Sequence, residues 1–240
     1  MSTIQQLIEW TNDNQGVVTI LLFFATIFIG WASGIFQALR TKPRFKIDVL
    51  PGPSLCATFP TGKKYEGYNV HRTAISVYMN VSNVGNAPAT IEKILVGYHW
   101  HLSKFNFLWL RYRISWFWLD CSITSMQDFQ YDFGGGYVKI YPFLLQVTSS
   151  IMKNPNTYLL VGQSVNGVVY FEQDESWGAC FPSPQRGTTK IKMKIRDSYG
   201  RVYSKVARIP IVTLDEAKKY NPTFGESFNI LRVKNNKENK

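Results

Sequence analysis

An uninterrupted apolar run dominates the start of the chain. The 21 residues from Gly16 to Phe36 contain no Asp, Glu, Lys or Arg and consist largely of Leu, Ile, Val and Phe. A helix of that length rises about 30 Å, which is the thickness of bilayer hydrocarbon. A cleaved leader would have a basic start and a shorter apolar stretch, and a buried core helix is the remaining alternative. The run predicts a transmembrane helix over residues 16–39, preceded by a short extracytoplasmic tail over residues 1–15.

The rest of the chain is patterned as strands. In residues 73–81, TAISVYMNV, apolar and polar side chains alternate, which is the period-two pattern of a half-buried strand. Further strands are expected over residues 45–50, 89–98, 137–147, 157–163, 165–172, 190–196 and 201–209. No long stretch between them has helical periodicity. The predicted fold class is therefore mainly β: a single N-terminal transmembrane helix followed by an antiparallel β-sandwich domain over residues 45–225.

A capping signal predicts one short helix near the C-terminal end of this domain. Thr213 and Glu216 are spaced as in a capping box, and Pro222 stops the helix. The last stretch, residues 226–240, is polar and basic, with few apolar residues to bury. We therefore expect it to be a disordered tail.

The charges around the apolar run are distributed asymmetrically. Two acids and no base precede the run, whereas Arg40, Lys42, Arg44 and Lys46 follow it within seven residues. Basic residues beside a span stay on the cytoplasmic side of the membrane. We therefore expect a basic juxtamembrane linker over residues 40–44 and a cytoplasmic domain at a bacterial inner (plasma) membrane, with the N-terminus outside.

Two small features bear on this arrangement. Cys56, Cys121 and Cys180 are odd in number and lack CxxC spacing, so they indicate neither a disulfide framework nor a zinc site, in agreement with a reducing compartment. Gly30 and Gly34 form a GxxxG pattern in the apolar run, which would let two spans pack closely in a homo-oligomer.

One turn carries a resemblance to a known family. The stretch NVSNVGNAPATI, residues 80–91, combines Asn83, Gly85 and Pro88 in a dense turn cluster. It resembles the N-x-G-x-A-x-A connection of bacterial immunoglobulin-like modules of the cell-adhesion-related type. The resemblance implies an Ig-like sandwich and no particular activity.

The least ordinary segment is an aromatic insertion over residues 98–119. Nine of the 21 residues from Tyr98 to Trp118 are aromatic, and basic residues are interleaved with them. One interpretation is an aromatic plug in the sandwich core. The other is an element in the membrane interface, because Trp prefers the headgroup layer and bases attract anionic lipid. The residues predicted to contact the membrane are Trp100, Phe105, Phe107, Trp109, Arg111, Arg113, Trp116 and Trp118.

A second basic surface is predicted on the final hairpin. In TTKIKMKIR the bases alternate with Ile and Met, so that they share one face of a strand. With DSYG as a four-residue loop, Arg196 would lie opposite Arg201 and Lys192 opposite Lys205, and such facing like charges favour an external anion. The alternative is a solvated face in a protein of net charge +11. The predicted anion-binding residues are Lys190, Lys192, Lys194, Arg196, Arg201 and Lys205.

Catalytic and metal-binding patterns are not found in the sequence. The histidines are His71, His99 and His101, and no cysteine or carboxylate stands at a ligand spacing from them. We therefore predict no enzyme activity and no metal or cofactor.

Three functional hypotheses follow. The first is a non-enzymatic single-pass protein whose domain binds a protein partner at the membrane surface, as an accessory or sensor component such as one in phage defence. The second is a membrane-perturbing effector, and the third is a membrane-tethered nucleic-acid-binding module. The anion expected at the basic hairpin is first of all an anionic lipid headgroup, with nucleic acid or an acidic protein as the alternatives.

Overall fold

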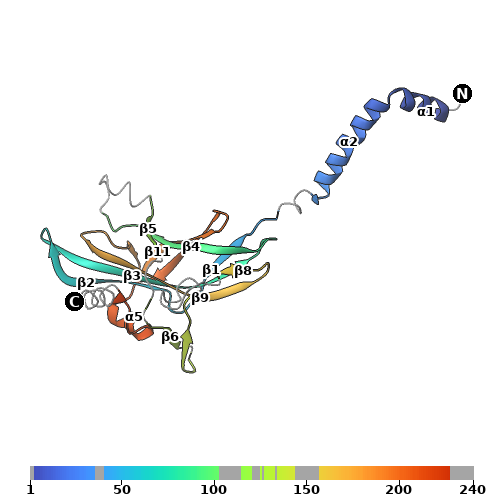
Figure 1. The fold of residues 1–240 in the computed structure, drawn as a ribbon. Coiled ribbons are helices and arrows are strands. Elements are labelled where there is room, and N and C mark those ends of the chain that lie inside the picture. The colour runs from blue at the N-terminus through green and yellow to red at the C-terminus, as the bar shows by residue number, and fades with distance from the viewer. Residues whose placement is uncertain are drawn as a thin grey trace, which may run out of the picture. The chain divides into compact units, whose positions relative to one another are not determined.

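The structure, a computed structural model, describes residues 3–35, 41–102, 115–120, 125, 127–132, 134–143 and 157–227. The chain divides into two compact units, Met1–Lys42 and Pro43–Lys240. In the first unit, α1 covers Thr3–Asp13 and α2 covers Gln15–Ala32 (Figure 1). With a mean hydropathy of 1.9 and no buried residue, α2 is long and apolar enough to cross a membrane. Its 18 residues rise about 27 Å, and it ends at Ala32, before the predicted limit at residue 39.

The end of α2 changes the expected packing of two spans. Gly30 lies inside α2, whereas Gly34 lies beyond its last residue and has a φ of +73°. Residues four apart share a helix face only where the helix continues through both of them. The two glycines therefore do not form the helical GxxxG face that the sequence predicts.

The second unit contains a four-stranded antiparallel sheet centred on one long strand. The strands are β1 (Phe45–Val49), β2 (Leu55–Tyr65), β3 (Tyr68–Asn83) and β9 (Ser164–Trp177). β3 pairs with β1 and β2 in succession and with β9 along its other edge. β3 is thus paired along one edge with β1 and β2, which precede it, and along the other edge with β9, which is far from it in the sequence.

A six-stranded antiparallel sheet packs against the first one. Its strands are β4 (Ala89–Tyr98), β5 (Phe117–Asp120), β8 (Tyr158–Leu159), β10 (Pro184–Gln185), β11 (Thr188–Asp197) and β12 (Val202–Pro210). β11 is central and pairs with β4 and β12, and β4 pairs with β5 at the far side. A separate hairpin consists of β6 (Phe129–Asp132) and β7 (Tyr137–Ile140), and α5 covers Leu214–Tyr220.

The main core lies between the two sheets. Apolar residues of β3 alternate toward it, and they meet apolar residues of β4, β9 and β11. The fully buried members from β3 and β11 are Ile75, Val77, Met79, Val81, Ile191, Met193 and Ile195. The predicted β-sandwich and the predicted alternation of β3 are therefore confirmed.

The outer face of β3 is covered instead of solvated. Ala74 and Tyr170 belong to a second apolar cluster with Phe129 and Phe224, and Ser76 on the same face is fully buried. The cover consists of α5, the β6–β7 hairpin and the turn that follows α5 (Figure 1). A period-two pattern does not reveal this, because small and polar residues on the outer face look like solvent-exposed positions.

The C-terminal end of the domain has the short helix that the sequence predicts, but the domain ends later than predicted. The Thr213 side chain and Glu216 form the predicted capping box at the start of α5. Phe224 and Ser227 are fully buried, so the packed domain extends past the predicted boundary at residue 225. The rest of the predicted tail, residues 228–240, lies outside the described residues.

Candidate functional site

The two sites predicted from the sequence meet on the outer face of the six-stranded sheet. Along β11, Lys190, Lys192 and Lys194 alternate with fully buried residues and therefore project away from the core. Two strands away, β5 pairs with β4, where Trp118 lies opposite Gly97. Gly97 lies in turn opposite Lys192 of β11. The aromatic segment and the basic hairpin thus share one surface.

The lysines lie over tryptophan rings. The Nζ atom of Lys194 lies 3.9 Å from the ring centroid of Trp118. The Nζ atoms of Lys190 and Lys192 lie 5.7 and 5.8 Å from the ring centroid of Trp116. These are cation–π distances, each worth about 0.5–1 kcal/mol at an exposed site. We call Trp116, Trp118, Lys190, Lys192 and Lys194 the lysine–tryptophan face.

Gly97 makes this arrangement possible. A Cβ atom at this position would lie 2.9 Å from Cε3 of Trp118 and 3.2 Å from Cβ of Trp116. The indole of Trp118 therefore packs against the backbone of β4 at Gly97, where any larger residue would displace it. In this position the ring of Trp118 reaches across β4 to the lysines of β11.

Charged residues that neighbour the lysine–tryptophan face form ion pairs with one another. Arg196 is 3.1 Å from Glu92, and Lys93 is 2.5 Å from Asp120. Within the described ranges, none of the three lysines of the face forms an ion pair with a carboxylate. The ring of His99 lies against that of Trp116, with centroids 4.1 Å apart and planes tilted by 35°, and its Nδ1 donates to the carbonyl oxygen of Ser115 at 3.0 Å.

The register of the final hairpin corrects the predicted anion site. Arg196 lies opposite Val202, and Lys205 lies opposite Met193, one position away from the prediction. Paired residues project from the same side, so Lys205 belongs to the inner side of β12. Arg201 lies in the turn, with its guanidinium 5.8 Å from the centroid of Tyr199. The six predicted bases are therefore not one surface.

The turn itself explains the shift. Asp197 Oδ1 accepts bonds from the backbone N–H of Tyr199 at 2.9 Å and of Arg201 at 2.8 Å. This carboxylate draws a fifth residue into the loop, as Asp side chains do when they bond to backbone ahead of them.

The described part of the aromatic segment begins in the core. Tyr98 is fully buried, and its hydroxyl donates to Gln173 Oε1 of β9, which links the two sheets. Burial raises the pKa of Tyr98 well above its usual range. Trp100 packs against the edge of the main core beside Phe117, with ring centroids 5.2 Å apart. The predicted contacts Phe105, Phe107, Trp109, Arg111 and Arg113 lie outside the described residues.

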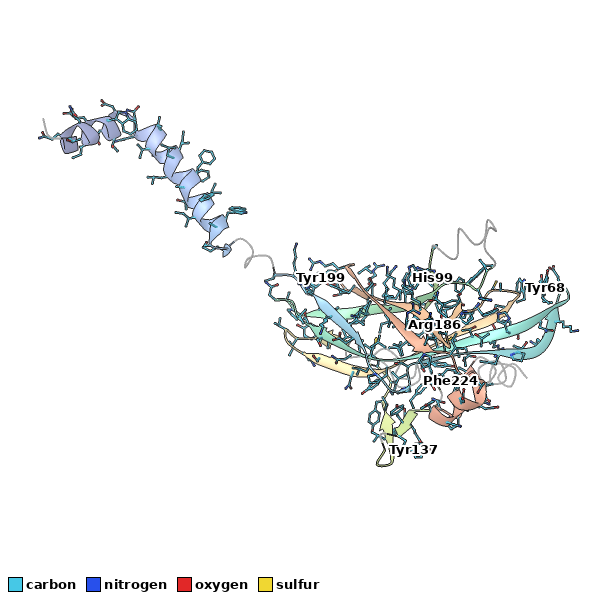
Figure 2. The ribbon with its side chains drawn as sticks, turned by 180° about the vertical axis from the view of Figure 1, so that it is seen from behind. Tyr68, His99, Tyr137, Arg186, Tyr199 and Phe224 are labelled. Atoms are coloured by element: carbon cyan, nitrogen blue, oxygen red, sulfur yellow. The ribbon has the colours of Figure 1, made fainter. Side chains whose placement is uncertain are left out.

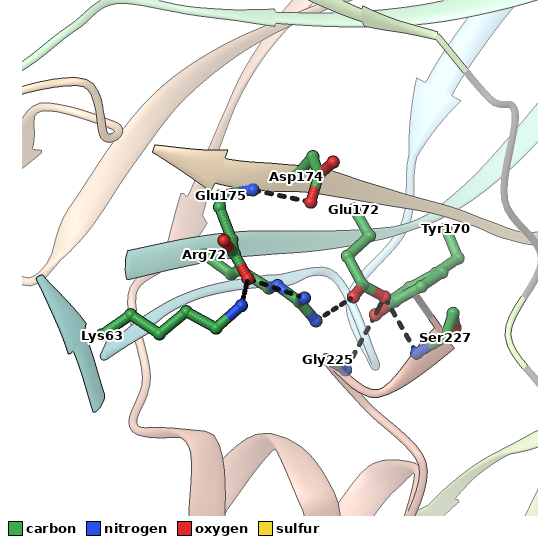
Figure 3. A network of polar contacts seen from close by, with 8 residues as sticks. All are labelled: Lys63, Arg72, Tyr170, Glu172, Asp174, Glu175, Gly225 and Ser227. Atoms are coloured by element: carbon green, nitrogen blue, oxygen red, sulfur yellow. Dashed lines mark hydrogen bonds and ion pairs between the residues drawn. The ribbon is translucent and has the colours of Figure 1, made fainter. Parts of the chain in front are cut away.

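Sequence reasoning missed a buried charge network on the outer face of the four-stranded sheet (Figure 3). Arg72 is 3% exposed and lies 3.8 Å from Glu172 and 3.4 Å from Glu175. Tyr170 Oη donates to the Glu172 carboxylate at 2.9 Å, and the backbone N–H of Ser227 donates to it at 3.2 Å. Burial, with the neighbouring Glu172 carboxylate, raises the pKa of Tyr170 well above its usual range. The network fastens the turn after α5 to β9.

Reactive groups are held in unreactive states. Cys56 is fully buried, and burial raises the pKa of its thiol to about 12, so the thiol stays protonated and weakly nucleophilic. Among the described residues, no group of three or more His, Cys, Asp or Glu is placed to hold a metal ion.

Comparison with known proteins does not assign a family to this chain. No family model matches the sequence, and a search of curated proteins finds no significant match.

Proposed function

We propose that this protein is a non-enzymatic, membrane-anchored binding module whose lysine–tryptophan face recognises an acidic protein partner at the membrane surface. The observation that carries the proposal is the row formed by Lys190, Lys192 and Lys194. Its ammonium groups lie over Trp116 and Trp118, and no carboxylate among the described residues pairs with them. Three like charges held side by side repel one another, and carboxylates of a partner would relieve that repulsion.

The position of the rings favours an acidic protein over nucleic acid. Single-strand binders use aromatic faces on which bases stack. Lys194 already lies 3.9 Å from the centroid of Trp118, so one face of that ring is covered by its own cation. The ring of Trp118 is also packed against Gly97 of β4, whereas a membrane-inserting tryptophan projects from its surface. A broad, flat, acidic surface suits this geometry best.

The membrane part of the proposal comes from α2 and its flanks. α2 would span a bacterial plasma membrane, and Arg40, Lys42, Arg44 and Lys46 would hold the second unit on the cytoplasmic side. The partner would then be an acidic protein met at the inner surface of that membrane.

Reporter fusions test the orientation. We expect a reporter enzyme that folds only outside the cytoplasm to be inactive when fused after Lys240, and a cytoplasm-dependent reporter to be active there. The flank after α2 contains four bases within residues 40–46 and the flank before α2 contains none, which gives the expected direction. The matched control places the same reporters before Thr3, where the activities should be exchanged. A C-terminal fusion active outside the cytoplasm would contradict the cytoplasmic domain.

Charge reversal tests the lysine–tryptophan face. In full-length protein, Lys190→Glu/Lys192→Glu/Lys194→Glu should weaken binding to polyglutamate by about tenfold or more, which corresponds to about 1.4 kcal/mol. The folding of the domain should be unchanged, because these side chains project away from the core. Binding is measured by tryptophan fluorescence at several salt concentrations, since screening should weaken it further.

Two further variants separate geometry from charge. Lys64→Glu/Lys205→Glu/Lys219→Glu removes the same charge from exposed positions elsewhere and should leave polyglutamate binding nearly unchanged. Gly97→Val keeps every lysine and displaces Trp118, and it should weaken binding as well. Equal losses in both triple variants would show a general charge effect and contradict the proposal. Tighter binding of oligothymidylate than of polyglutamate would favour the nucleic-acid alternative.

A further inference from the structure

The turns at one end of the β-sandwich gather around the point where the chain enters it. The backbone N–H of Val84 donates to Arg44 O at 2.8 Å, and that of Gly162 donates to Asn83 O at 2.8 Å. Tyr203 Oη bonds to Pro43 O at 2.8 Å. The β3–β4, β8–β9 and β11–β12 turns therefore lie beside the first residues of the domain. We call this end, with residues 43–44, 84–87, 160–163 and 198–201, the proximal end.

A buried asparagine fixes the proximal end. Asn83 is fully buried, and its Nδ2 donates to Ala87 O at 2.9 Å and to Leu159 O at 3.2 Å. Its Oδ1 accepts from the backbone N–H of Gly85 at 3.1 Å. The β3–β4 and β8–β9 turns are thus held together by one side chain, and their tips form a rigid surface.

Apolar side chains stand exposed on these turns, where polar residues are the rule. Val84 is 54% exposed, Leu160 57%, Val161 53% and Tyr199 63%. They come from three different turns, which the contacts above bring to the same end of the sandwich. Grouped exposure of this kind marks an interaction site on a soluble surface.

Basic residues accompany the exposed apolar ones. Arg44 is exposed beside the Val84 backbone, and Arg201 adjoins the ring of Tyr199. The acid of the same turn, Asp197, is fully buried and is used by the backbone N–H groups of the turn. The proximal end thus presents exposed apolar side chains and basic residues, while the acid of its turn is buried. Such a surface is complementary to a bilayer, in which anionic headgroups cover an apolar layer.

The length of the tether brings lipid to this end of the domain. Ten residues, 33–42, separate the last residue of α2 from Pro43, and ten extended residues reach at most about 35 Å. Tyr68 lies at the other end of β3, and Asn83 follows it 15 positions later in the strand, a distance of about 50 Å. Figure 2 shows Tyr68 and Tyr199 at opposite ends of the domain. The tether therefore keeps the proximal end closer than the Tyr68 end to a bilayer that holds α2.

We infer that Val84, Leu160, Val161 and Tyr199 contact the headgroup layer of the bilayer in which α2 is anchored, with Arg44 and Arg201 binding anionic headgroups. The lysine–tryptophan face lies on the side of the sandwich, because Trp116 and Trp118 are near the end of β4 that is remote from the β11–β12 turn. The proximal end can then contact lipid while the lysine–tryptophan face binds a protein. This inference rests on the membrane-spanning role of α2 and not on the acidic partner.

Lipid-borne quenchers test the contact in the full chain. Cys121→Ser/Cys180→Ser is the background, and Cys56 is left in place because it is fully buried. An environment-sensitive fluorophore is attached to Val161→Cys, to Tyr199→Cys or, as the matched control, to Tyr68→Cys, which is 58% exposed in the parent. The protein is placed in nanodiscs of phosphatidylcholine with phosphatidylglycerol, or of phosphatidylcholine alone.

Nitroxide lipids should quench the fluorophores at positions 161 and 199 and leave that at position 68 unchanged, more strongly in the discs that contain phosphatidylglycerol. Leu160→Glu should reduce the quenching at position 199, whereas Tyr65→Glu should not. Lys190→Glu/Lys192→Glu/Lys194→Glu should leave the quenching intact, which separates this inference from the proposed acidic partner. Equal quenching at positions 68 and 161, absence of quenching at 161 and 199, or loss of quenching in the triple lysine variant would overturn the inference.

Discussion

Replacement of Arg72 by alanine is expected to lower the free energy of unfolding by about 3–5 kcal/mol. Arg72 is 3% exposed and lies between Glu172 and Glu175. Without the guanidinium, the buried Glu172 carboxylate keeps its bonds from Tyr170 and from the Ser227 backbone but loses its counter-charge. A buried carboxylate without a counter-charge is far more costly than the intact pair.

Denaturant titration, followed by near-ultraviolet circular dichroism, measures this effect. Lys63→Ala is the matched control, because Lys63 also pairs with Glu175, at 2.7 Å, but is largely exposed. It should cost less than about 1 kcal/mol. Arg72→Met/Glu172→Gln removes both buried charges and should recover much of the loss. An Arg72→Ala protein within about 1 kcal/mol of the parent would show that the network does not hold the domain together.

Gly167→Val is expected to destabilise the domain by a comparable amount, about 3–5 kcal/mol, by expelling a buried phenylalanine. A Cβ atom at Gly167 would lie 2.6 Å from Cα of Phe143 and 2.7 Å from its N. Backbone cannot yield as the end of a flexible side chain can. Phe143 is fully buried in the main core, and its N–H donates to Val168 O at 2.8 Å. The substitution would therefore remove an aromatic ring from the core together with its backbone bonds.

Gly135→Val is the control for this substitution. No atom lies within 4 Å of a Cβ built on Gly135, and its backbone is outside the left-handed region. The same unfolding titration should place Gly135→Val close to the parent. A Gly167→Val protein as stable as Gly135→Val would mean that the segment around Phe143 contributes little to the core.

Local patterns in the sequence were sufficient to predict individual strands and the helix α5. They were insufficient to predict which residues of neighbouring strands lie opposite each other. The alternation in β3 and the Thr213–Glu216 capping box depend on neighbours within a few residues, and both are confirmed. The register of β11 and β12 depends on a loop whose length the Asp197 side chain changes. A shift by one position moves a residue to the other face of a strand, which is why Lys205 was misplaced.

The candidate site was predictable residue by residue and not as a surface. The lysines of β11 and the tryptophans of residues 98–119 both stood out as chemical anomalies in the sequence. The contact between them depends on Gly97, which has no side chain to displace Trp118. This role can be recognised only once β4 is known to lie between β5 and β11. Likewise, Arg72 and Glu172 are 100 positions apart, and no spacing rule joins them. An alternation continued through residues 165–177 would have placed Tyr170 and Glu172 on one face.

The position of β3 has a consequence for biosynthesis. β3 ends at Asn83 and β9 begins at Ser164, so about 80 residues must be translated before the second edge of β3 can pair, which takes about 4–16 s at 5–20 residues per second. Throughout that interval β3, the longest of the strands that the structure describes, offers the free backbone groups of this edge to any extended chain nearby. The central strand of the other sheet, β11, is synthesised later still. The four-stranded sheet cannot close before β9 is made and the six-stranded sheet cannot close before β12 is made, so a premature stop before residue 164 leaves no smaller version of the domain.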